Sequence, residues 1–200
     1  MWVGAIVGAI CFVLYLTVFD TWVIPNTDPR LTTAILPTLY PDDRILTSRH
    51  GVPTAGMLVR CTSPEPGTEY VIGRIMGNTG DTVIVDNGRV SINGKNIPSR
   101  HACPPVKIQH PISGEDVSLS CAAEESGAWT YHYLIQPERP EGQRSAVVEP
   151  GKWFLVSDNR AIHHDSRDFG QIDATTCEHI VFRLWGDSFV DTERRFTFLY

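Results

Sequence analysis

The stretch SDNRAIHHDSRDFG (residues 157–170) combines acidic, amide and guanidinium side chains with few apolar ones. Asp, Asn and Ser favour turns because their side chains hydrogen-bond to nearby backbone groups. Asp165 and Arg167 carry opposite charges two positions apart, and such a pair can hold a loop whether or not any chemistry takes place there. The stretch therefore predicts an ordered turn that is held by its own side chains.

Two earlier segments also carry residues that shape the backbone. Residues 32–39, TTAILPTL, contain Pro37, and residues 73–81, GRIMGNTGD, contain Gly77 and Gly80. Proline fixes φ near −65°, and glycine permits positive φ. Both segments therefore predict fixed changes of chain direction.

The body of the chain has the composition of a strand-and-turn protein. Its 200 residues include 14 prolines and 16 glycines, with short β-branched runs between them. Asn87-Gly88 and Asn93-Gly94 suit tight hairpin turns between alternating apolar residues. No long helical periodicity follows residue 24, so we expect a mainly β fold. The net charge of −6 and the lack of a basic run argue against nucleic-acid binding.

The N-terminus predicts a membrane anchor. No charged side chain occurs from Trp2 to Phe19, and a helix of that length covers roughly 27 Å, close to the ~30 Å hydrocarbon core of a bilayer. We expect an anchor helix over residues 1–24 and a β domain over residues 25–200. A cleaved signal peptide is the alternative, but the stretch lacks a basic start and is longer than the usual apolar segment. The flanking charges are too mixed to give the orientation.

Residues 99–146 are polar and irregular, and we expect an insertion there. Cys103 and Cys121 lie within it. They are either a loop-closing disulfide of an exported domain or two small buried side chains, and the spacing does not decide between these. No Cys/His array has the spacing of a zinc site, so we expect no metal or other cofactor.

Two aromatic patterns stand late in the chain. Trp129, Tyr131 and Tyr133 alternate along a predicted strand, and we assign this aromatic face to core packing. The last residues, RRFTFLY (194–200), are either a final strand or a contact surface for a partner, and both interpretations remain open.

The three segments resemble motifs of type I signal peptidases, which are membrane-anchored Ser/Lys peptidases. In chain order behind an apolar N-terminus, they are the first motif (residues 32–39), the second motif (73–81) and the third motif (157–170). Members of that family carry S-x-S-M-x-P-T-L, then K-R-x-x-G-x-x-G-D, then G-D-N-R-x-x-S-x-D-S-R. The resemblance implies a signal-peptidase-like antiparallel β domain with one N-terminal membrane helix. The matching residues that we interpret as structural are Pro37, Asp158, Asn159, Arg160, Asp165, Ser166 and Arg167.

The departures fall on the residues that perform the chemistry in the family. The serine nucleophile falls on Ala34, the lysine base on Gly73, and the serine of the last motif on His163. Arg74 cannot replace the lysine, because a guanidinium stays protonated. Thr32 matches the position whose hydroxyl helps the oxyanion hole. We therefore expect no working catalytic residues, and only a remnant of the oxyanion hole.

Other residues offer weaker routes to catalysis. Thr33 is one position from the nucleophile, and a displaced nucleophile points elsewhere. His163 and His164 do not fall at the base position, so we expect a surface or partner-contacting pair.

We expect a catalytically silent accessory or structural subunit of a larger membrane protein complex, placed on the outer side of a bacterial inner membrane and in contact with the lipid bilayer. Respiratory, photosynthetic, secretion and conjugation assemblies all remain open as partners. The alternatives are a divergent signal-peptide or propeptide peptidase, and a chaperone that binds extended peptides without cutting them.

Overall fold

The computed structural model describes residues 6, 8, 15, 17–126 and 129–199. No helix within this part of the chain is long and apolar enough to cross a membrane. Most of the predicted anchor lies outside the described residues. Its predicted end at residue 24 is wrong, because Phe19–Val23 form strand β1 and pair with β2 (Arg44–Ser48). The β-branched and aromatic residues there suit a strand, and length alone had assigned them to the helix.

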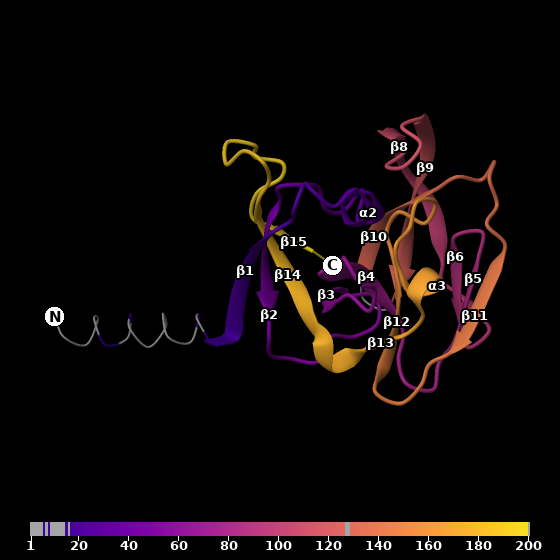
Figure 1. The fold of residues 1–200 in the computed structure, drawn as a ribbon, viewed down its shortest axis with the longest axis horizontal. Helices are drawn as coiled ribbons and strands as arrows, with labels where there is room; N and C mark the ends of the chain where they lie inside the picture. Colours follow the sequence, from indigo (N-terminus) through magenta and orange to yellow (C-terminus); the bar gives the residue numbers. More distant parts are fainter. Residues whose placement is uncertain (1–5, 7, 9–14, 16, 127–128, 200) are drawn as a thin grey trace.

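The fold is mainly β, as predicted, and its largest sheet forms the body of the molecule (Figure 1). All its strand pairs are antiparallel. The order is β1-β2-β14-β3-β4-β12-β13, and β15 pairs with β14. The further members are β3 (Leu58–Thr62), β4 (Tyr70–Gly77), β12 (Lys152–Val156), β13 (Ile172–Asp173), β14 (Cys177–Trp185) and β15 (Thr197–Phe198).

A second, four-stranded sheet contains the predicted hairpins. Its order is β11-β5-β6-β7, and its strands are β5 (Thr82–Asp86), β6 (Arg89–Ile92), β7 (Lys95–Asn96) and β11 (Gln143–Val147). Asn87-Gly88 and Asn93-Gly94 both adopt positive φ, which confirms the two tight turns.

Three long strands form the third sheet and correct the prediction for residues 99–146. Its order is β10-β9-β8, and its strands are β8 (Ser99–Gln109), β9 (Asp116–Ser126) and β10 (Trp129–Ile135). The hairpin of β8 and β9 projects from the body of the molecule (Figure 1). Pro104 and Pro105 made the region look irregular, but β8 is an edge strand, where proline is tolerated.

Two disulfides tie strands together. Cys103 and Cys121 are bonded across β8 and β9. Cys61 and Cys177 are bonded across β3 and β14, where they stand directly opposite each other with their Cα atoms 4.0 Å apart. The sequence did not indicate the second bond, because 116 positions separate its cysteines.

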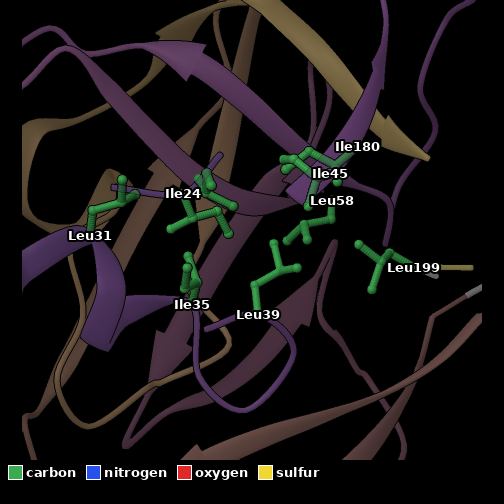
Figure 2. Packing of buried hydrophobic residues seen from close by; sticks show 9 residues of the cluster. Ile24, Leu31, Ile35, Leu39, Ile45, Leu58, Ile180 and Leu199 are labelled. Carbon is green, nitrogen blue, oxygen red and sulfur yellow. The ribbon is translucent and has the colours of Figure 1, made fainter. Parts of the chain in front are cut away.

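The hydrophobic core lies on both faces of the large sheet, in several clusters. Figure 2 shows the cluster that packs beneath the first motif, whose members are Ile24, Leu31, Ile35, Leu39, Ile45, Leu58, Ile72, Ile180 and Leu199. The aromatic face on β10 packs inward as predicted, with Tyr131 and Tyr133 buried.

Two short helices position the first and third motifs at the large sheet. Helix α2 (Pro29–Ala34) begins after Asp28, whose carboxylate accepts from the N–H groups of Arg30 and Leu31. Helix α3 (Ser166–Phe169) begins at a capping box formed by Asp165 and Asp168. The 3-10 helix η1 (Ala174–Thr176) connects β13 to β14. The caps fix where the first and third motifs meet β4 and β12.

Candidate functional site

One buried ion pair joins all three motifs. The Arg74 guanidinium, on β4, donates to Asp158 through Nε at 2.7 Å and Nη2 at 3.1 Å. The Thr38 hydroxyl donates to the same carboxylate. Arg74 Nη1 also donates to the Gly56 carbonyl at 2.9 Å, and the guanidinium carbon lies 3.9 Å from the centre of the Tyr131 ring. Both charged side chains are fully buried, so the pair compensates charges that water cannot reach.

Asn159 holds the end of helix α2 against the third motif. Its backbone N–H donates to the Ala34 carbonyl at 2.9 Å, and its side-chain amide donates to the Thr33 carbonyl at 3.1 Å. Its Oδ1 accepts from the N–H of Ile162 at 2.9 Å. Ala34 is therefore fixed in position and is only 1% exposed.

Gly73 on β4 is closed in by the neighbouring strand. A Cβ atom at this position would lie 3.1 Å from Leu155 Cβ and 3.4 Å from the Val156 carbonyl oxygen. The contact with Leu155 is tighter than ordinary van der Waals packing, so a side chain here requires that neighbour to shift by a few tenths of an ångström.

The turn in the third motif contains the predicted ion pair. Arg167 donates to Asp165 through Nε at 3.0 Å and Nη2 at 2.9 Å. Burial opposes the charge of Asp165, but Arg167 and the N–H of Ser157 hold its pKa well below the usual range. The Ser166 hydroxyl accepts from the Leu155 N–H at 2.9 Å. The turn is thus held by its own side chains, as the sequence predicted.

Comparison with known proteins agrees with this geometry. The model of the family described as "Signal peptidase, peptidase S26" matches residues 1–185. The chain belongs to the signal peptidase family. Signal peptidase IB from Staphylococcus aureus strains Mu50, N315 and MW2 is 26% identical to it over 153 residues, which cover 74% of this chain and 72% of the relative.

Thr32 stands where the resemblance to signal peptidases places a hydroxyl of the oxyanion hole, but this hydroxyl is hydrogen-bonded within its own helix. Thr32 Oγ1 donates to the Asp28 carbonyl at 3.0 Å, one turn back in the helix. In this arrangement the hydroxyl proton points into the helix. Thr32 is also only 8% exposed.

His163 stands where the signal peptidase motif has its last serine, and two carboxylates hold it. Nδ1 lies 2.7 Å from Asp168 Oδ2, and Nε2 lies 3.1 Å from Glu141 Oε2. Burial disfavours the charged ring, but these two hydrogen bonds raise the pKa of His163 to about 9. A ring that stays protonated at neutral pH is not a general base.

The prediction that His163 and His164 form a surface pair is wrong for His164, which is buried. His164 is only 5% exposed, and its Nε2 lies 2.8 Å from Glu65 Oε2. Both histidines lie in the loop after β12. His163 is the more exposed of the two.

One group of side chains has the composition of a metal site. Ligand atoms of His163, Asp165 and Asp168 lie within 4.8 Å of one another. Asp165 is already paired with Arg167, and Asp168 with the protonated His163. The donor set is therefore satisfied by cations of the protein, and it fits an ion-pair network better than a metal.

A second buried ion pair, which the sequence did not indicate, supports the site from β9. Arg160 Nη2 donates to Glu124 Oε2 at 2.5 Å, and the Tyr131 hydroxyl donates to the same oxygen at 2.9 Å. Burial opposes the charge of Arg160, but Glu124 keeps its pKa above the usual value. Burial, with Glu124 beside it, raises the pKa of Tyr131 well above its usual range. Tyr131 therefore links the two buried arginines, since Arg74 lies over its ring.

Breaking the second pair from one side should be costly. Glu124→Gln leaves Arg160 buried without its counter-charge, and we expect unfolding in urea to show a loss of about 3–5 kcal/mol. The matched control is Glu125→Gln on the adjacent residue, whose pair with Arg100 is exposed; it should change stability by less than ~1 kcal/mol. Equal losses in the two variants would contradict a structural role for the buried pair.

The pKa of His163 predicts a specific pH dependence of stability. The folded-state value of about 9 exceeds the ordinary 6.5, so the contribution is complete below about pH 6.5 and is lost as pH rises through 9. We expect His163→Gln to remove up to about 3 kcal/mol of stability at pH 6 and little at pH 10, measured by urea unfolding. The exposed His132→Gln is the control. A His163→Gln curve parallel to that of the wild type would rule out the proposed charge state.

Proposed function

We propose that this chain is a non-cleaving member of the signal peptidase family that works by association, as an accessory or structural subunit of a larger membrane complex. The observation that carries the proposal is the contrast between two sets of residues. The side chains that hold the motifs together are present and bonded, whereas the positions of the nucleophile and base are Ala34 and Gly73.

The loss of chemistry involves two independent positions. Ala34 has no atom that can attack a carbonyl, and Gly73 has none that can take a proton. Packing around Gly73 supports the view that the change is accommodated, because Leu155 Cβ lies only 3.1 Å from where a side chain would begin. A single replacement of the nucleophile would leave a base, and this chain has neither.

The scaffold, in contrast, supports a role that requires a rigid domain. Two buried ion pairs join the turn after β12 to β4 and β9, and two disulfides tie β3 to β14 and β8 to β9. Disulfides persist in oxidising compartments, which supports placing the β domain on the outer side of a bacterial inner membrane. The apolar N-terminal stretch supports attachment to the bilayer, by a segment that ends before β1.

Restoring the nucleophile alone should not restore cleavage. We expect Ala34→Ser to leave a fluorogenic peptide with an apolar stretch and an Ala-x-Ala site uncut, because no base stands at Gly73 to take the hydroxyl proton. Signal peptidase IB serves as the positive control for the assay, and Thr33→Ala tests the neighbouring hydroxyl.

Two results would contradict this account. Cleavage by Ala34→Ser above the enzyme-free blank, with the wild type inactive, would show that a base is present after all. Cleavage by the wild type that is lost in Thr33→Ala would show a divergent peptidase instead of a silent relative.

A further inference from the structure

One edge of β14 is completed by the C-terminus of the chain itself. β2 pairs with β14 from His179 to Trp185, and β3 covers the opposite edge only at residues 177–179. β15 pairs with Phe182 and Arg183. Since β2 already occupies one edge at these two residues, β15 must lie on the β3 side, where β3 has ended. The large sheet therefore has a slot for one further strand, and Thr197–Phe198 fill it.

The tail is held in this slot by alternate residues. Leu199 is 7% exposed and joins the core cluster at one end, with Leu39 and Leu58 (Figure 2), and its N–H donates to the Val181 carbonyl at 3.3 Å. Thr197 Oγ1 accepts from Arg183 Nε at 3.0 Å. Between them, Phe198 is 61% exposed. Inward anchors two positions apart are how a sheet edge binds an extended peptide.

The tail also forms a wall of a cavity beside the motifs. The cavity measures about 270 Å³, and its lining includes Thr38, Arg74 and Tyr131 together with Thr197 and Leu199. Figure 1 shows β15 beside β14 in the large sheet. Arg183 Nη1 bonds to the Thr38 carbonyl at 3.3 Å. The strand slot thus adjoins the ion pair that joins the three motifs.

The residues just before β15 include an ion-paired arginine, Arg194, and a residue with an unfavourable backbone conformation, Phe196. Arg194 Nη2 lies 2.6 Å from Asp43, which is fully buried, and the guanidinium lies over the ring of Tyr40. Phe196 has φ of 52°, in the left-handed region that disfavours residues with a large side chain. The tail is therefore held by an ion pair at Arg194 and has a strained backbone at Phe196.

We propose that this edge of β14 is a binding site for an extended peptide with a hydroxyl and a leucine two positions apart, and that residues 196–199 are its resident ligand. In the intact chain the tail closes the site to extended segments of other proteins. This inference does not depend on the loss of catalysis, because strand addition needs no nucleophile.

The test uses a fluorescent peptide with the sequence RRFTFLY and measures its anisotropy with the full-length chain. Leu199→Asp removes the deepest anchor of the resident tail, and we expect it to bind the peptide at least ten-fold more tightly than the wild type. Val52→Ser alters an exposed side chain outside the tail and should bind like the wild type. Equal affinity in all three proteins, or no binding by folded Leu199→Asp, would overturn the proposal.

A measurement on the unaltered chain covers the case in which Leu199→Asp does not fold. The amides of Phe196 and Leu199 should exchange with deuterium at least ten-fold more slowly than in the free peptide, because each donates to a β14 carbonyl. Excess RRFTFLY peptide should compete with the tail and change this protection. Unprotected amides, or protection that the peptide does not affect, would show that the tail is no exchangeable ligand.

Discussion

The ion pair between Arg74 and Asp158 is the contact on which the arrangement of the molecule depends. It joins β4 to the turn after β12, and the Thr38 hydroxyl adds the segment after α2 to the same carboxylate. Neither charge is reached by water, so each can remain only while the other is present. Three parts of the chain that lie far apart in sequence are therefore held in one geometry by one buried carboxylate.

The second pair extends this arrangement into another sheet. Glu124 on β9 is bonded to Arg160 and to Tyr131, and the Tyr131 ring lies beneath Arg74. The third-motif turn is thus connected to the projecting hairpin as well as to the large sheet. This network needs no nucleophile and no base. It explains how the scaffold of a peptidase family is maintained around Ala34 and Gly73.

The fold class and most of the structural residues could be predicted from the sequence, because turns and charge pairs leave local signals. Asn87-Gly88 and the pair of Asp165 with Arg167 are examples in which the interacting residues are close in sequence. Glu124 and the bond between Cys61 and Cys177 gave no such signal, since their partners are brought near only by strand pairing.

The errors have equally physical causes. Strand β1 was assigned to the anchor because Trp22 and Val23 continue the apolar stretch beyond Asp20. The long strands β8 and β9 looked irregular because both carry polar residues on exposed faces. His164 looked like a surface residue, but its partner Glu65 comes from a distant loop.

The central claim is that this member of the signal peptidase family acts through constant companions rather than by cutting peptides. The most direct test is to extract membranes in mild detergent, separate the complexes by native size, and identify what travels with this chain. The account predicts a large assembly with partners at fixed stoichiometry. A free monomer that cleaves signal peptides would contradict it.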